Sequence, residues 1–363
     1  MRWFASILIT VLLTHFGNTA LFADDFYLDR SVYKNTLRFE IDNDVLLKED
    51  SNFSNGWSFQ YHSACYASWE DTGAPKFVNW VGNHLPSFGD DESIVLYGQG
   101  VGQNMITPGD LTNPNPPPGD LPYAGTLTYT LNWQKFNQRS AQIFQATVGI
   151  LGKESLAQQF QEIVHENLGL GESPQGWDSQ RDTEPILNLA YAHFYSLMHI
   201  GSYTDGWAVQ LSLAPAAYLG NLSTAVEMGL GIRFGWNMQE GFNAFPAPPG
   251  LGFYTNMLIP KPEVSSPHGV ELVIGGKATG LIYSVVYDGS VITSDDRNID
   301  YENFVVSGMI GLNYHYYRFF SIRLAFVQET DLLIEDSLPP TQPGDEKTRL
   351  DNSYSTFMID FHF

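Results

Sequence analysis

The sequence predicts an all-β protein, an up-and-down antiparallel transmembrane β-barrel of about twelve strands with a short helix in one extracellular loop. Apolar and polar residues alternate with period two along most of the chain, as expected where one face meets lipid and the other a polar lumen. Aromatic residues make up 14% of the chain. The chain also ends on Phe357, Ile359, Phe361 and Phe363, which share one strand face that lipid can cover.

The N-terminus predicts a secretory signal peptide over residues 1–23. Arg2 supplies a positive charge, Ile7–Leu13 is almost entirely apolar, and small or polar residues follow before Ala23. No later run reaches the roughly 18 apolar residues that a transmembrane helix needs. We therefore expect residues 24–363 to form a single barrel domain.

Strand candidates of suitable length recur throughout the mature chain, and many approach the roughly 9–11 residues that cross a bilayer at a tilt. The first is typical, because Leu37, Phe39 and Ile41 alternate with charged residues that would face the lumen. The candidates lie near residues 35–45, 55–66, 92–106, 123–135, 140–150, 185–198, 206–218, 225–237, 269–286, 303–315, 317–330 and 352–363.

An even number of strands returns the C-terminus to the side of the N-terminus, which is periplasmic in such barrels. The odd-numbered connections are then extracellular, near residues 46–54, 107–122, 151–184, 219–224, 287–302 and 331–351. The tight turns at 136–139 and 315–317 fall on the periplasmic side, as expected. The segments 67–91 and 238–268 fall there too and are long for periplasmic turns.

Charge and cysteine content narrow the possible functions. The formal net charge of -22 argues against binding of nucleic acid, which favours a basic surface. Acidic loops are compatible with divalent cations, although solubility alone can also explain the charge. Cys65 is the single cysteine, so an internal disulfide and a cysteine-type structural zinc site are excluded.

Residues 154–168 predict a helix inside an extracellular loop, ended by Gly169 and Gly171. His165 and Gln161 are four residues apart and project from the same helix face. A histidine there can act as a general base towards water, and the neighbouring amide can orient that water. The alternative is a surface histidine on an amphipathic helix.

A second candidate site lies where the first strand ends, at Asp42-Asn43-Asp44. Oxygen-bearing side chains such as those of Asn43 and Asp44 suit Ca²⁺, and the Ser54 hydroxyl could lie near Asp44 across the first hairpin. The alternative is a polar strand terminus that simply enters a loop.

Several short motifs occur in a characteristic order over nearly the whole mature chain. They are Phe39–Asp44 with Phe53–Gly56, Gln103 with Thr107, Pro108 and Asp110, Asp120–Gly125, Gln161 with His165, and Gly176–Gln180, with weaker marks at Gly220-Asn221 and Asp288-Gly289. In this set the chain resembles the lipid A 3-O-deacylase (LpxR-like) family. Ser54 stands where threonine is usual in that family, and Leu121 stands where arginine is usual.

The resemblance implies a monomeric outer-membrane barrel with lipid A, the anchor of lipopolysaccharide, as its substrate. It further implies a Ca²⁺-dependent esterase that removes the 3′-acyloxyacyl group. By this resemblance His165 activates water beside Gln161, and Asn43, Asp44 and Ser54 match positions around the cation. Glu172 is the best match, one residue out of register, for an acidic residue that follows the histidine.

Three other interpretations remain open at this stage. An outer-membrane phospholipase A would carry histidine two residues before Ser54, where this chain has Asn52. The chain could also be a non-enzymatic barrel, either a porin, which needs an open lumen lined by charge, or a structural barrel. A soluble periplasmic β-protein would partition into buffer instead of detergent.

Overall fold

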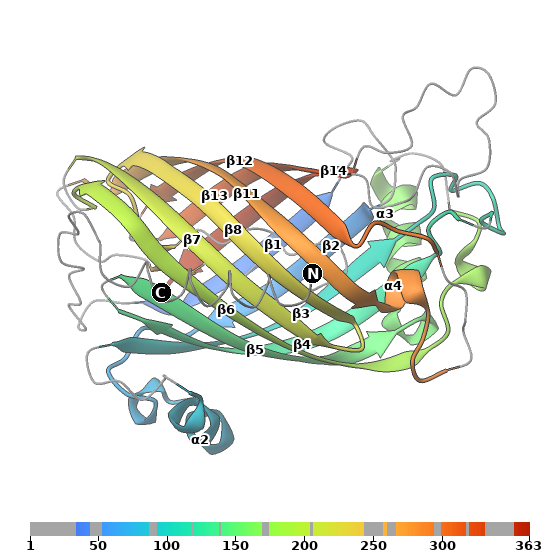
Figure 1. Ribbon diagram of the computed structural model, residues 1–363, viewed down its shortest axis with the longest axis horizontal. Coiled ribbons are helices and arrows are strands. Elements are labelled where there is room, and N and C mark those ends of the chain that lie inside the picture. Colours follow the sequence, from blue (N-terminus) through green and yellow to red (C-terminus); the bar gives the residue numbers. More distant parts are fainter. Residues whose placement is uncertain are drawn as a thin grey trace, which may run out of the picture.

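The computed structural model (Figure 1) describes residues 34–43, 53–86, 93–117, 119–137, 139–168, 174–203, 206–242, 257–259, 266–293, 299–316, 319–330 and 352–363. Within these ranges twelve antiparallel strands close into one barrel, in which chain neighbours pair, β8 pairs with β11, and β1 pairs with β14. The strands are β1 (Thr36–Asn43), β2 (Phe53–His62), β3 (Ile94–Ile106), β4 (Ala124–Phe136), β5 (Ser140–Leu151), β6 (Glu184–Gly201), β7 (Trp207–Gly220), β8 (Ser223–Trp236), β11 (His268–Ser284), β12 (Phe304–Tyr316), β13 (Phe320–Glu329) and β14 (Asn352–His362). The predicted barrel and its strand number are confirmed.

Side chains along the strands alternate between an apolar exterior and a polar interior. In β12, Phe304, Val306 and Ile310 are exposed, whereas Ser307 and Asn313, at odd-numbered positions of the same strand, are buried. A strand that alternates in this way satisfies lipid on one side and a hydrogen-bonded lumen on the other. The expectation of a polar lumen is therefore confirmed.

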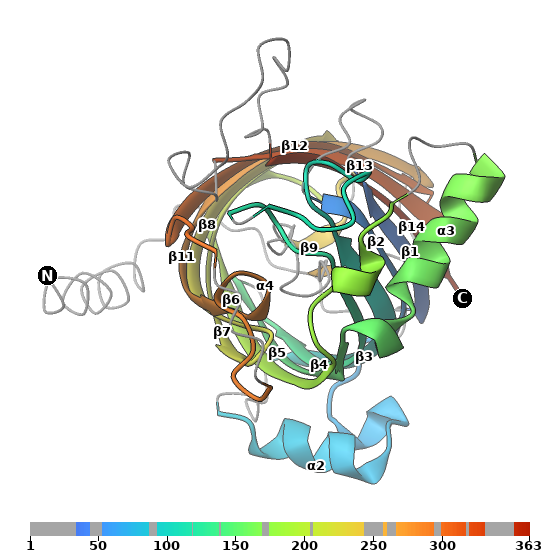
Figure 2. The ribbon, with the colours of Figure 1, turned by 90° about the vertical axis from the view of Figure 1, so that its right-hand side faces the viewer.

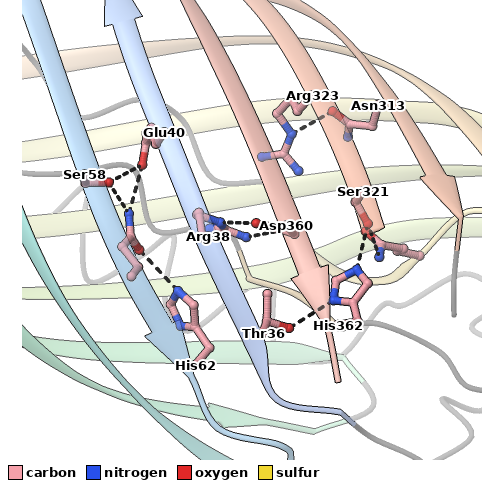
Figure 3. A network of polar contacts seen from close by, with 12 residues as sticks. Thr36, Arg38, Glu40, Ser58, His62, Asn313, Ser321, Arg323, Asp360 and His362 are labelled. Atoms are coloured by element: carbon pink, nitrogen blue, oxygen red, sulfur yellow. Dashed lines mark hydrogen bonds and ion pairs between the residues drawn. The ribbon is translucent and has the colours of Figure 1, made fainter. Parts of the chain in front are cut away.

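Charged side chains in the interior form ion pairs or hydrogen bonds, as Figure 3 shows at the end where β1 and β14 close the barrel. The Arg38 guanidinium donates to both carboxylate oxygens of Asp360, at 2.6 and 2.8 Å. Glu40 accepts from Ser58 and from the side-chain amide of Gln60, at 3.2 and 2.9 Å. Because a buried charge without a partner is costly, such pairing lets a narrow barrel hold charged side chains.

The two long segments on the α2 side of the barrel contain structure of their own. Residues 67–91 include η3 (Glu70–Thr72) and α2 (Lys76–His84), which lies beside the barrel wall (Figure 1). In the second segment β9 (Glu240–Phe242) pairs with β10 (Met257–Ile259). Arg233 of β8 donates to the carbonyl of Gly241 at 2.8 Å and so holds β9 inside the ring of strands (Figure 2).

Several strand ends differ by a few residues from the sequence prediction, and at two of them the chain takes up another structure. The strand predicted over 269–286 stops at Ser284, because the Ser284 hydroxyl accepts from the Val286 amide and starts α4 (Val285–Asp288). The strand predicted over 55–66 ends at His62, and Tyr66 forms only an isolated bridge with Val95.

The predicted loop helix is also present in the connection from β5 to β6. That connection contains η4 (Lys153–Ser155), α3 (Ala157–Leu168) and η5 (Trp177–Ser179). Across the described ranges, every helix is too short or too polar to cross a bilayer. The signal-peptide prediction for residues 1–23 lies outside the described residues.

Candidate functional site

The start of α3 packs against the outer wall of the barrel, at the opposite end from α2 (Figures 1 and 2). Its first residue, Ala157, is buried against Gly125 of β4. A Cβ at Gly125 would overlap with the Ala157 side chain and lie 2.5 Å from the Ser155 hydroxyl. The glycine that ends the Asp120–Gly125 motif therefore lets α3 approach the wall.

Gln103 of β3 links the wall to the start of this helix. Its amide nitrogen donates to the backbone carbonyl of Ser155 at 2.6 Å. Its carbonyl oxygen accepts from the indole N–H of Trp57 in β2 at 3.1 Å. The Trp57 ring in turn lies 5.5 Å from the ring of Phe160 on α3. Two strands and the helix are thus joined through one buried amide.

The other face of α3 is held by η5. The indole N–H of Trp177 donates to the side-chain oxygen of Gln161 at 2.8 Å, and both residues are buried. The Trp177 ring lies 5.2 Å from Tyr123, which packs with Met105 and Ala157 in the same buried cluster. Residues from four of the sequence motifs therefore meet around the first half of α3.

Tyr123 and Arg181 connect this cluster to neighbouring loops through hydrogen bonds. The Tyr123 hydroxyl donates to the carbonyl of Leu111 at 3.0 Å. Burial raises the pKa of Tyr123, so the hydroxyl stays a neutral donor. The backbone N–H of Arg181 donates to the backbone carbonyl of Tyr123 at 2.9 Å. The Arg181 guanidinium donates to the carbonyl of Val286 in α4 at 2.6 Å.

The predicted site residues are described to different extents. Gln161 is buried in the cluster, and His165 follows it one turn later on α3. Asn43 is the last residue of β1, and its carbonyl accepts from the Ser355 hydroxyl at 2.8 Å. Ser54 is the extra residue of an irregularity in the β2–β3 pairing. Asp44 and Glu172 lie outside the described residues.

Strand register brings Asn43 and α3 to the same rim of the barrel. Ile41 of β1 pairs with Trp57, the residue whose ring contacts Phe160 of α3. Asn43 follows two residues after Ile41, so the strand alternation puts both on the outer face. In Figure 2, α3 lies outside the ring of strands next to β1 and β2.

The donor atoms predicted around the cation are all oxygens, from an amide, a hydroxyl and carboxylates, which suits Ca²⁺. Within the described ranges, no three His, Cys, Asp or Glu side chains gather in a way that could hold a metal ion. Two of the four predicted ligands, Asp44 and Glu172, fall outside those ranges. The cation prediction thus rests on donor chemistry and on the common rim of Asn43 and α3.

Residues 6–337 of the chain match the family model described as "Outer membrane protein LpxR". The chain belongs to the LpxR family. Among solved structures, LpxR from Salmonella typhimurium matches with a TM-score of 0.66 at 15% sequence identity, over 90% of this chain and 100% of that chain. This LpxR-family chain is therefore an outer-membrane protein, and the two chains share their fold.

Other outer-membrane structures match less closely. The β domain of the Bordetella autotransporter BrkA matches with a TM-score of 0.39 and 8% identity, over 92% of this chain and 99% of that chain. The COG4313 channel from Pseudomonas putida F1 gives 0.36 and 11%, over 96% and 98%. Likenesses this distant carry no argument about the LpxR-family chain. A search of curated protein sequences gave no match.

Sequence reasoning did not predict how the LpxR-family motifs join. Gln103, Tyr123 and Trp177 fall inside quoted motifs, yet nothing in their spacing predicts that they surround Gln161 and the start of α3. Arg181 was not predicted as part of the site, because it lies just outside the Gly176–Gln180 motif and belongs to no periodic pattern. Its position directly after Gln180 was the one available signal.

Proposed function

We propose that this protein is an outer-membrane lipid A deacylase that hydrolyses the 3′-acyloxyacyl ester of lipid A and acts as a monomer. Membership of the LpxR family supports the proposal, together with the motifs through which the sequence resembles lipid A 3-O-deacylases. The observation that carries it is the position of α3 on the outer wall at the rim. A lipid in the membrane can reach such a site sideways, without entering the lumen.

His165 is proposed as the general base. A neutral imidazole can take a proton from water as the water oxygen attacks the ester carbonyl, and can return that proton to the leaving alkoxide. The histidine belongs to the helix that Gln103, Gly125 and Trp177 hold against the barrel wall. The role of those residues in the proposal is to fix the direction in which α3 presents His165.

Gln161 is proposed as a positioning residue next to His165. Its side-chain oxygen accepts the Trp177 indole N–H, so it links α3 to η5. Orientation of the attacking water by the Gln161 amide stays a prediction. Both roles need the side chain to keep its present rotamer, which its burial favours.

A divalent cation, Ca²⁺ in this proposal, would be held by oxygens of Asn43, Asp44, Ser54 and Glu172. When bound, it would supply positive charge for the oxyanion that develops on the ester carbonyl. Asn43 ends its strand on the outer face near α3, which supports this assignment. The negative charge of the chain also favours divalent cations over anionic groups near the loops.

The test uses the purified full-length protein in mixed micelles with lipid A, with products measured by mass spectrometry. We expect loss of one acyloxyacyl group, abolition of that loss by EGTA, and recovery when Ca²⁺ is added back. Acyl loss that continues unchanged in EGTA would refute the cation role. An unchanged lipid A spectrum at every Ca²⁺ concentration would refute the function.

Ser54→Thr separates this mechanism from a phospholipase A mechanism with a serine nucleophile. Threonine keeps a hydroxyl that can bind a cation, so we expect Ser54→Thr to retain activity while His165→Ala loses it. A serine nucleophile would instead form an acyl-enzyme, visible as a mass increase of the intact protein. Detection of that adduct at Ser54 would contradict the water mechanism.

A further inference from the structure

We propose that α2 is an interfacial helix that inserts Phe77 and Trp80 into the phospholipids of the periplasmic leaflet of the outer membrane. α2 lies alongside the barrel wall, at the opposite end from α3 (Figure 1). Asn35 before β1 and Phe363 after β14 pair through their backbones at the same end. This identifies the end as periplasmic, because an outer-membrane barrel with an even number of strands starts and ends on the periplasmic side.

α2 covers wall positions that would otherwise face lipid. The indole N–H of Trp133 in β4 donates to the backbone carbonyl of Val78 in α2 at 2.9 Å. Around this bond, outward-facing side chains of four strands pack in one cluster with Trp69 and Val78. They are Tyr61, Val95, Tyr97, Leu131, Trp133, Phe144 and Ala146. The helix is therefore docked at the edge of the lipid-facing band.

Close packing fixes how α2 is rotated about its own axis. Gly82 lies against the Trp69 indole, since a Cβ there would come within 2.5 Å of ring atom Cε2. Val78 and Gly82 are one turn apart and both buried, so this face points towards Trp69 and the wall. The rest of the helix surface therefore faces away from the barrel wall.

That remaining surface divides into an aromatic flank and a polar flank. Phe77 and Trp80 are 57% and 62% exposed, and they share a face with His84, whose ring stacks on Trp80 at 4.6 Å. The other flank carries Asn79 and Asn83, which are four residues apart. A helix that is docked on one side and has aromatic residues on one of its two free flanks suits a boundary between lipid and water.

The residues around α2 favour membrane lipid as the partner that covers the aromatic flank. One row further along the wall from the covered residues, Phe59, Val101 and Val148 are exposed on the same outer face, so the wall that α2 covers continues into surface that faces lipid. Aromatic side chains are enriched at this depth of outer-membrane barrels. On the polar flank, Asn83 donates to Glu70 at 2.7 Å, which keeps acidic groups on the side for water.

Spin labels on the full-length protein test the proposal in vesicles of phosphatidylethanolamine and phosphatidylglycerol. In a Cys65→Ala background, single cysteines replace Phe77 and Trp80. Phe59→Cys on the exposed wall is the lipid-facing reference, and Asn83→Cys on the polar flank is the water-facing reference. Collisions with oxygen report exposure to lipid, and collisions with the water-soluble complex NiEDDA report exposure to water.

We expect labels at 77 and 80 to resemble the label at 59, with frequent oxygen collisions and a loss of NiEDDA collisions relative to position 83. Labels at 77 and 80 that collide with NiEDDA as often as the label at 83 would overturn the proposal. Protection from both agents would also overturn it, because it would indicate a protein partner or a second copy of the chain on this flank.

Discussion

At the scale of single residues, the candidate site depends on a few hydrogen bonds between distant motifs. Gln103 and Ser155 are 52 residues apart in the sequence, and Gln161 and Trp177 are 16 apart. The sequence indicated that His165 and Gln161 share a helix face, because helical periodicity determines that. It could not indicate which side chains clamp the helix, because contacts between loops follow no period.

Replacement of Trp177 by phenylalanine should loosen α3. The ring is kept, but the buried oxygen of Gln161 loses the N–H that it accepts, at a cost of about 1–3 kcal/mol. We expect faster amide hydrogen exchange along α3 and lower deacylase activity in a barrel that remains folded. The matched control is Trp80→Phe, an exposed tryptophan on α2. Equal effects of the two substitutions would show that the Trp177–Gln161 bond has no special role.

At the scale of elements, the strands were predictable and the long connections were not. Apolar and polar residues alternate over many positions in each of the twelve strands. This pattern therefore predicts where each strand lies to within a few residues. α2 and β9 are short, and side-chain contacts from the barrel strands, through Trp133 of β4 and Arg233 of β8, fix their positions. The long segments 67–91 and 238–268 therefore gave no local signal of what they form.

The docking of α3 can be tested through Gly125. An alanine there would overlap with Ala157, so the helix must move away from the wall, and overpacking of this kind costs about 1–3 kcal/mol. We expect Gly125→Ala to lose most deacylase activity while its barrel still shows the heat-dependent gel shift of the parent. In the control Gly308→Ala, the new Cβ has no heavy atom within 4 Å. Full activity of Gly125→Ala would mean that the position of α3 is unimportant.

At the scale of the whole molecule, the barrel is filled with paired polar side chains. Arg233 bonds Glu271 at 3.0 Å and also donates to Gln210 and to the carbonyls of Gln239 and Gly241. It thereby ties three strands to the β9 segment inside the lumen. Such filling suits a barrel whose chemistry lies on its outer rim better than one that conducts ions through its centre.

Loss of Arg233 should destabilise the whole barrel. Arg233→Met would leave Glu271, which is fully buried, without its guanidinium partner, and breaking a buried pair costs about 3–5 kcal/mol. We expect a lower unfolding midpoint in urea. The control Arg139→Met removes an exposed arginine next to a turn and should leave the midpoint nearly unchanged. Identical midpoints for the two variants would contradict this account of the lumen.

In the proposed function, a histidine at the barrel rim deacylates lipid A. This role is tested by the lipid A mass spectrum of cells that produce either the parent protein or His165→Ala at equal levels of folded barrel. We expect lipid A lighter by one acyloxyacyl group with the parent protein, and an unmodified spectrum with His165→Ala. The same acyl loss with both proteins, or with neither, would contradict it.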